Sequence, residues 1–329
     1  MTLTNNDLRK LLEDMIYIRT FEDRLRINFA AGAIPGFVHL GIGQEAIMAG
    51  ICFNLQDGDT IGASHREHGV LLCRGIGGDK LMAELYGKRT GICKGKGGSM
   101  HAGDLEKSTL GCNGILGSAQ TIINGFSFAH KFRKDGKLAV TVFGDGASNR
   151  GEFHEGLNFA SIWNLPTIYF ICNNGYAISV PKSKQNKVDD LSARGAAYGV
   201  PGIQIDGNDI FAVLEATEEA FKRARAGGGP TLIEAKTYRW RGHFEGDPDI
   251  YRDQEEKDFW MAKCPIRRFE KYLLDHEVMT QAEIDGIWKS ASDRVDGHQK
   301  FAEESPWPDR DDLLRDVYYC DEGSNYLKF

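Results

Sequence analysis

Two apolar segments, 138–143 and 167–172, constrain the possible folds of this chain more than any other feature. Both are rich in β-branched residues and predict buried strands of a parallel sheet. Residues 152–163 between them predict a helix, and Pro166 ends that helix. Two parallel strands joined by a crossover helix belong to sheets whose faces are covered by helices. This unit therefore predicts an α/β domain.

The alternation of strands and helices continues on both sides of this unit. Residues 59–63 predict a short strand, and a further strand, helix and strand are predicted at 203–206, 210–226 and 231–236. Such alternation is typical of a parallel sheet with helices on both faces. We predict that fold class for the chain.

The two ends of the chain have helical patterns. Thr4, with Asp7 three residues later, predicts a helix start, and apolar residues then recur on one helical face. From Pro265 onward the pattern is helical and polar. We predict one domain of 329 residues, with an N-terminal helical arm, an α/β core and a helical C-terminal extension at 1–34, 35–260 and 261–329.

Polar residues follow both central strands. The first strand ends in Gly144, Asp145 and Gly146, and the second delivers Asn173 and Asn174 to the same edge. In open α/β sheets this edge forms the crevice in which ligands bind. The glycines let a phosphate approach, while a carboxylate and an amide oxygen suit Mg²⁺ bound together with a diphosphate. We therefore predict a site for Mg²⁺ and a diphosphate.

Three other glycine-rich segments have simpler interpretations. The G-x-G-x-x-A pattern at 41–46 follows no long buried strand, so it is a weak dinucleotide fingerprint. Residues 94–101 lack the GK[ST] ending of a P-loop and predict an ordered loop near a cofactor. Residues 110–117 predict a turn, and 120–132 are apolar enough to predict a helix of the core.

Basic side chains follow the short strand predicted at 59–63. Arg66 lies where an arginine can clamp a diphosphate, because its fork matches phosphate oxygens. His65 and His68 resemble a metal pair, but the sequence offers no third ligand at a usual spacing. A hydrogen-bonded loop is the simpler interpretation of these two histidines.

Charge and cysteine content exclude several classes of function. A net charge of -7 and a pI near 5.8 argue against a nucleic-acid or anionic-membrane partner. The seven cysteines never form CxxC, so they indicate reduced thiols rather than a disulfide framework or zinc ribbon. We expect a cytoplasmic protein, because the N-terminus resembles neither a signal nor a transit peptide and no apolar run reaches membrane-spanning length.

The GDG triplet at 144–146, twenty-six residues and then the Asn pair at 173–174 resemble the thiamine-diphosphate motif of the transketolase and 2-oxoacid dehydrogenase superfamily. Further segments narrow this resemblance to the α subunit of the thiamine-dependent first component of 2-oxoacid and acetoin dehydrogenase complexes. They span residues 35–255 in the order of that family, namely GFVHLGIGQEA at 36–46, HREHG at 65–69, GKGGSMH at 95–101, NNGY at 173–176 and RGH at 241–243.

The resemblance implies roles for particular residues. Asp145, the side-chain oxygen of Asn174 and the backbone carbonyl of Tyr176 would be the Mg²⁺ ligands. The diphosphate would meet the first turn of the helix that follows Asp145, through backbone amides. The whole implied cofactor-binding set is His65, Arg66, Gly114, Leu116, Gly144, Asp145, Gly146, Ala147, Asn174, Tyr176 and His243.

Two histidines are implied to act on the substrate, and two positions depart from better-known relatives. His39 and His243 resemble the active-site histidines that pass protons near the thiazolium. His65 stands where the family often has tyrosine. Cys172 stands where branched-chain enzymes have an arginine that contacts the diphosphate, so that contact is absent here.

The resemblance also implies an activity and its partners. The chain would act with a β subunit, two α with two β chains, and pass an acetyl group to a lipoyl-bearing acyltransferase. The segment 241–247 resembles the acetoin-cleaving branch, which splits this small carbonyl substrate into acetaldehyde and a two-carbon unit. Pyruvate or a branched-chain 2-oxoacid is the alternative substrate. A non-enzymatic subunit that binds a nucleotide or diphosphate for assembly is a more remote alternative.

Overall fold

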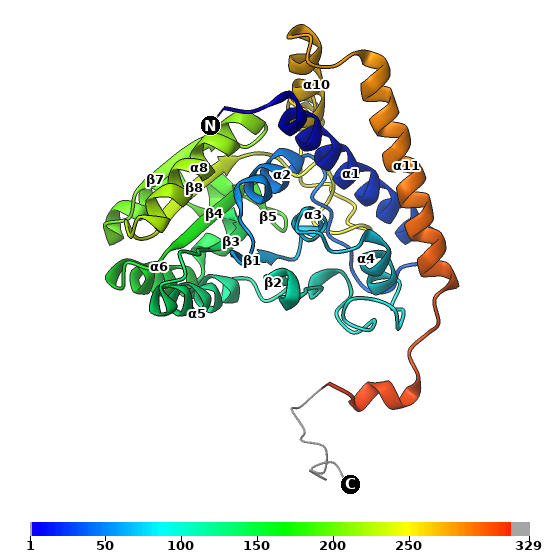
Figure 1. Ribbon diagram of the computed structural model, residues 1–329, viewed down its shortest axis with the longest axis horizontal. Coiled ribbons are helices and arrows are strands. Elements are labelled where there is room, and N and C mark those ends of the chain that lie inside the picture. Colours follow the sequence, from blue (N-terminus) through cyan, green and yellow to red (C-terminus); the bar gives the residue numbers. More distant parts are fainter. Residues whose placement is uncertain (1, 317–329) are drawn as a thin grey trace.

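The computed structural model describes residues 2–316, so Cys320 and the end of the predicted C-terminal extension lie outside the described part. Its centre is a six-stranded parallel sheet (Figure 1) with the strand order β2-β1-β3-β4-β8-β7. The strands are β1 (Thr60–Ser64), β2 (Thr109–Asn113), β3 (Ala139–Gly144), β4 (Thr167–Asn173), β7 (Gly202–Asp206) and β8 (Thr231–Lys236). The predicted fold class is confirmed.

Helices cover both faces of the sheet. Successive side chains of a strand point to opposite faces, and both faces carry apolar side chains that must be buried. In β4, Ile168 and Phe170 belong to the core on one side, while Tyr169 and Ile171 belong to the core on the other side. The first core packs under α1 (Asn5–Ala30), α2 (Glu45–Asn54), α8 (Ile210–Arg225), α10 (Pro265–Asp275) and α11 (Gln281–Glu304). The second packs under α6 (Gly151–Ile162).

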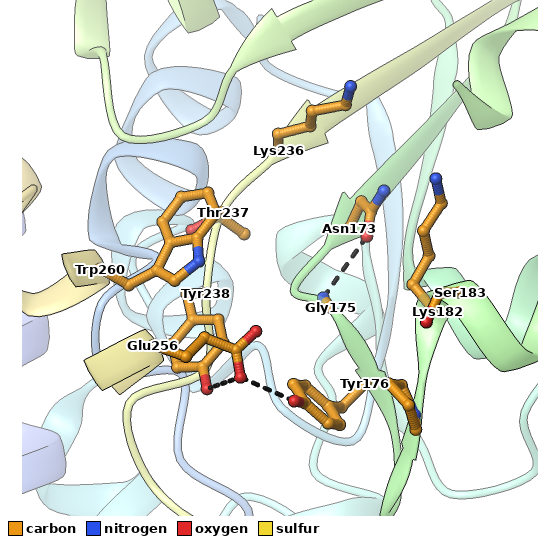
Figure 2. A pocket seen from close by; sticks show the side chains of 11 residues that line it. Asn173, Gly175, Tyr176, Lys182, Ser183, Lys236, Thr237, Tyr238, Glu256 and Trp260 are labelled. Carbon is orange, nitrogen blue, oxygen red and sulfur yellow. Dashed lines mark hydrogen bonds between the residues drawn. The ribbon is translucent and has the colours of Figure 1, made fainter. Parts of the chain in front are cut away.

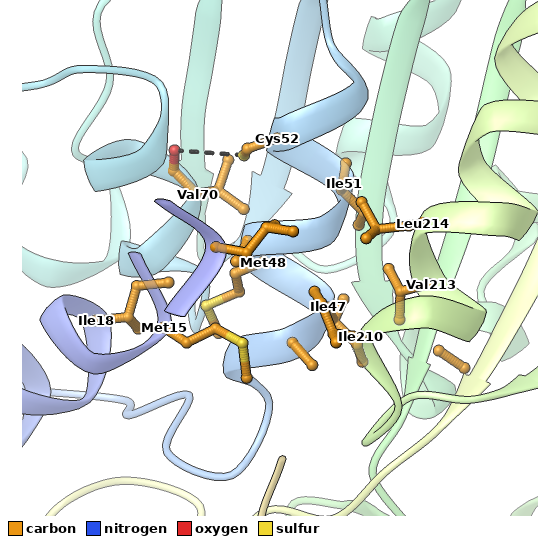
Figure 3. Close-up of a cluster of buried hydrophobic side chains, with 14 of the residues drawn as sticks. Met15, Ile18, Ile47, Met48, Ile51, Cys52, Val70, Ile210, Val213 and Leu214 are labelled. Atoms are coloured by element: carbon orange, nitrogen blue, oxygen red, sulfur yellow. Dashed lines mark hydrogen bonds between the residues drawn. The ribbon is translucent and has the colours of Figure 1, made fainter. Parts of the chain in front are cut away.

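Helix α2 joins the N-terminal helix to the sheet (Figure 3). Its residues Ile47, Met48 and Ile51 lie between side chains of α1 and side chains of α8 such as Val213. The eight residues Glu45 to Cys52 are all buried. An unbroken buried run of this kind fits a helix that is enclosed by other helices and not by solvent.

The N-terminal helix begins as predicted. Thr4 accepts a hydrogen bond from the Asp7 amide, and the Asp7 carboxylate accepts one from the Thr4 amide at 2.9 Å. This capping box satisfies two backbone groups that the first turn leaves unpaired. The apolar face that follows, with Leu8, Leu11 and Met15, is buried in the main core.

Two expectations for residues 110–132 need correction. The first part of the glycine-rich segment belongs to strand β2 (Thr109–Asn113), which pairs in parallel with β1 despite a register irregularity between Ile61 and Gly62, whereas residues 114–117 form the predicted turn. Helix α5 (Ser118–Arg133) is buried on one side only and is not enclosed in the core. Ile123 is buried, but Ile122 and Phe132 are 43% and 80% exposed, since apolar residues occur on both sides of this helix.

None of the helices within residues 2–316 has the length and apolar character needed to cross a bilayer. The six cysteines of that range are free thiols.

Candidate active site

The ends of β3 and β4 build the candidate site. Gly144 pairs in parallel register with Cys172, so Asp145 and Asn174 follow neighbouring strands at one edge of the sheet. A cavity of about 180 Å³ opens there. It is lined by Ser64, His65, Arg66, Glu67, Leu116, Gly144, Asp145, Gly146, Ala147, Arg150, Asn174, Tyr176, Ala177, Ile178, Arg239 and His243. The structure thus brings together residues that follow five strands, β1, β2, β3, β4 and β8.

Gly114 and Cys172 lie apart from this cavity. Gly114 packs beside the His101 ring, which a Cβ at that glycine would approach to 3.2 Å. Its backbone role toward a cofactor therefore stays a prediction. Cys172 is buried in the core between the sheet and its helices, and burial raises the pKa of its thiol well above the usual value.

Asp145 and Asn174 present buried oxygens to the same cavity. Oδ1 of Asp145 and Oδ1 of Asn174 have no hydrogen-bond partner among the described residues. Burial raises the pKa of the Asp145 carboxyl to about 6, although the backbone N–H of Asn174 and the charge of Arg239 favour its ionised form. Buried oxygens without partners are rare in folded proteins, so this pair fits the ligand set of a hard cation such as Mg²⁺.

The segment after β4 is held so that only one asparagine of the pair faces the cavity. Asn173 donates its side-chain amide to Glu234 on the neighbouring strand β8 at 2.6 Å. Gly175 has φ +89°, a left-handed conformation that favours glycine, and the chain turns there toward Tyr176. Asn174 is therefore left to line the site.

A second cavity of about 250 Å³ lies beside this segment (Figure 2). There the hydroxyls of Tyr176 and Tyr238 both donate to Glu256, at 2.6 and 3.1 Å. Trp260 stacks on Tyr238 with ring centroids 5.6 Å apart. These contacts hold the Tyr176 side chain, and Tyr176 lines both this cavity and the one at Asp145.

Gly146 and Ala147 occupy a different element from the one expected. Residues Asp145–Asn149 form the short 3-10 helix η3, and α6 begins only at Gly151. The chain is extended at Arg150 (φ -79°, ψ 147°), which separates the two helices. The first helical turn after Asp145 is thus a 3-10 turn that precedes α6, and the expected contact of a diphosphate with the amides of Gly146 and Ala147 in that turn stays a prediction. A Cβ at Gly146 would lie 2.5 Å from that of Ala177, so the close approach requires glycine there.

Two buried arginines give the cavity a positive charge. Arg66 follows β1 and donates to the carbonyls of Leu40 and His243, both at 2.8 Å. Burial, together with the charge of Arg239, lowers the pKa of Arg66 to about 9. Burial also lowers the pKa of Arg239, which is 1% exposed. Two desolvated cations beside one cavity favour an anionic ligand.

Sequence reasoning missed Arg239. It follows β8, as Arg66 follows β1, and the same rule that selected a strand-end arginine at Arg66 would have selected it. The Arg239 side chain donates to the backbone carbonyl of Ile178 at 2.9 Å and to the Tyr251 hydroxyl at 2.8 Å.

Three histidines form a cluster, and two of them, His65 and His243, line the cavity. The His39 ring lies 4.3 Å from the His65 ring and 5.0 Å from the His243 ring, between centroids. One nitrogen from each ring lies within 4.8 Å of the others. His39 and His243 are therefore the nearby nitrogen ligands that the sequence spacing did not reveal for His65. His68 is instead hydrogen-bonded to Glu22 and Ser99, as the interpretation of a hydrogen-bonded loop predicts.

The histidines of this cluster are neutral near pH 7. Burial, with the charge of Arg66, lowers the pKa of His39 to about 2 and that of His243 to about 4. The same causes lower the pKa of His65. Within residues 2–316, Nδ1 of His39 and Nε2 of His65 are buried without a hydrogen-bond partner. Neutral imidazoles with unused nitrogens are able to accept hydrogen bonds from a substrate hydroxyl.

The loop that carries His243 is ordered by its own charges. The His243 amide donates to Asp247 at 2.7 Å, and the Glu245 amide donates to Val38 at 2.8 Å. Arg252 donates to the carbonyls of Arg239 and Arg241 and forms an ion pair with Asp249. Buried charge-assisted bonds of this kind hold a long loop in one geometry.

Comparison with known proteins gives a consistent set of relatives. The family described as "Dehydrogenase E1 component" matches residues 13–310. The α subunit of acetoin:2,6-dichlorophenolindophenol oxidoreductase from Bacillus subtilis is 45% identical, over 97% of this chain and 95% of its own. The corresponding subunit from Cupriavidus necator is 44% identical over 97% and 96%. The α subunit of the pyruvate dehydrogenase E1 component from Rhizobium meliloti is 39% identical over 95% and 90%.

Proposed function

The chain belongs to the dehydrogenase E1 component family, and we propose that it is the α subunit of a thiamine-diphosphate-dependent enzyme that cleaves acetoin. The observation that carries the proposal is the pair of unpartnered oxygens of Asp145 and Asn174, within the described chain, beside two buried arginines. A divalent cation and an anionic tail would satisfy both features at once. Thiamine diphosphate bound with Mg²⁺ supplies that combination.

We assign the cation to Asp145, Asn174 and the carbonyl of Tyr176, and the diphosphate to Arg66, Arg239 and His243. Gly146, Ala147 and Leu116 line the same cavity, and their backbone groups would complete the contacts. When bound, the cofactor supplies a carbanion that attacks a carbonyl and accepts the electron pair of the breaking C–C bond. The chain itself binds, orients and shields the reacting groups.

The histidine cluster suits acetoin as the substrate. Release of acetaldehyde requires the acetoin hydroxyl to lose its proton, and a neutral imidazole is a suitable acceptor. We propose that His39 and His243, whose backbone amide donates to Asp247, hydrogen-bond the acetoin oxygens and pass this proton. Two relatives named for acetoin support this substrate over pyruvate.

The family's α subunits act with β subunits, so a β chain is required for the proposed activity. We propose an assembly of two α and two β chains, from which a lipoyl-bearing acyltransferase accepts the acetyl group. The α chain alone is then expected to be inactive, because the cavity in this chain is one part of the complete site.

Reconstitution tests this function. The α and β chains, co-purified with Mg²⁺ and thiamine diphosphate, are assayed with acetoin, pyruvate and branched-chain 2-oxoacids, using 2,6-dichlorophenolindophenol as the electron acceptor. We expect the highest kcat/KM for acetoin and no turnover by the α chain alone. A higher kcat/KM for pyruvate would favour the second candidate, a pyruvate dehydrogenase α subunit, which is supported by the relative from Rhizobium meliloti at 39% identity.

A further inference from the structure

Helices α5 and α6 present large apolar side chains to solvent on one side of the sheet. The two helices lie next to each other in Figure 1 and contact each other. We call the following six residues the apolar face: Ile122, Phe128, Phe132, Phe159, Ile162 and Trp163. Phe132 and Ile162 are 80% and 70% exposed, whereas Phe153 and Leu157 on the inner side of α6 are fully buried. The exposure is therefore confined to the outer side of the helix pair.

The apolar face is continuous and not a set of scattered residues. Phe128 on α5 packs against Trp163 with ring centroids 5.6 Å apart, and Phe159 packs against Trp163 at 6.1 Å. These rings contact each other across the two helices while each remains at least 40% exposed. Contiguous exposed apolar patches on soluble proteins mark sites of interaction.

Helix α5 has the composition of an interface helix. From Ser118 to Ala129 it contains no charged residue, although one side of it faces solvent. At Gly125 on the exposed side, a Cβ would meet no atom of the described chain within 4 Å, so another backbone has room to approach. Depletion of charge with enrichment of aromatic residues distinguishes the centre of an interface from the rest of a surface.

The apolar face is connected to the candidate active site. Leu116, just before α5, and Arg150, just before α6, both line the cavity at Asp145. Ile115, beside Leu116, is 65% exposed. A protein that covers the open side of the cavity therefore meets the N-terminal ends of these two helices first, and the apolar face lies along the same helices.

We propose that the apolar face of α5 and α6 is the surface on which the β chain docks, an inference that rests on the proposed function. A second copy of this chain is the less suitable occupant. If it bound α5 and α6, it would block the helix ends that a β chain must contact to cover the cavity at Asp145. The basic residues Lys131, Arg133 and Lys134 follow at the C-terminal end of α5 and are exposed. The matching surface of the β chain would then be apolar, with acidic residues at one border.

The test uses the co-expressed α and β chains. The double variant Phe132→Ser with Ile162→Ser removes the two most exposed side chains of the apolar face. The matched control, Leu105→Ser with Leu313→Ser, removes two side chains that are 67% and 75% exposed elsewhere on the chain. The αβ dissociation constant is measured by sedimentation, and circular dichroism checks that each α chain is folded.

We expect the first variant to weaken αβ association at least about 100-fold while the control associates as the wild type does, since central apolar contacts dominate interface affinity. Unchanged association of the first variant, or equal loss in the control, would overturn the inference. So would a variant that loses only α–α association. Wild-type α that turns over acetoin without any β chain would instead overturn the proposed function.

Discussion

The side-chain amide of Asn173 and the carboxylate of Glu234 form a 2.6 Å hydrogen bond between neighbouring strands. Glu234 is fully buried and also accepts from the Ser192 amide at 2.9 Å. This carboxylate therefore directs one asparagine away from the cavity and leaves Asn174 facing it. The orientation of the candidate cation ligand thus depends on a residue from a strand that does not itself reach the cation.

Replacing Glu234 tests that dependence. Glu234→Ala leaves two buried donors without an acceptor, which costs about 2–5 kcal/mol of unfolding free energy in total. We expect urea unfolding to show this loss of unfolding free energy in Glu234→Ala. We also expect calorimetry to show a weaker affinity of the variant for Mg²⁺ with thiamine diphosphate. Glu234→Gln, whose one amide oxygen can still accept from Asn173 but whose NH2 group cannot accept from Ser192, is the control and should lose less of both. Wild-type cofactor affinity in Glu234→Ala would show that Asn173 does not orient its neighbour.

Removal of Asp145 tests the cation site directly. We expect Asp145→Ala to abolish Mg²⁺-dependent binding of thiamine diphosphate, because the remaining ligands lack a charge to hold a hard cation. Calorimetry of the αβ complex with and without Mg²⁺ measures this. Asp135→Ala, which removes an exposed aspartate that pairs with His130, serves as the control. Binding of nucleotides instead of thiamine diphosphate by the wild type would favour a non-enzymatic assembly subunit.

The sequence predicted those parts of the structure that depend on local pattern. β3 and β4 were found because their β-branched runs and the helix between them are local signals, and Asp145 and Asn174 follow from where those strands end. β2 was missed because Gly111, with φ +93°, has no strand propensity and joins the sheet only by pairing with β1. The cluster of His39, His65 and His243 was missed as a unit because its members are distant in sequence.

Arg239 is expected to contribute to anion binding. Arg239→Met removes one of two buried cations beside the cavity, so we expect affinity for Mg²⁺ and thiamine diphosphate to fall about 10- to 100-fold, the range of one to two charge-assisted bonds. Arg150→Met, at an exposed position on the same cavity, should have a smaller effect. Equal losses in the two variants, measured by calorimetry, would argue against a special role for Arg239.

The histidine cluster predicts how stability depends on pH. The folded pKa of His243 is about 4 and that of His39 about 2, both below the usual 6.5. Below pH 6.5 the unfolded chain gains protons that the folded chain does not accept, so stability falls as the pH drops from about 6.5 towards 4. For His243, which is only partly buried, we expect a loss of about 1–2 kcal/mol after allowing for solvent screening.

The His243→Asn variant should lose less stability than the wild type over this pH range, as measured by urea unfolding of the α chain at pH 7 and pH 4.5. His276→Asn, at an exposed histidine on the far side of the main core, is the control and should follow the wild type. Identical pH dependence in all three proteins would mean that His243 has the same pKa in the folded and the unfolded chain. That outcome would contradict the desolvation of the His243 ring, since desolvation is what lowers its folded pKa.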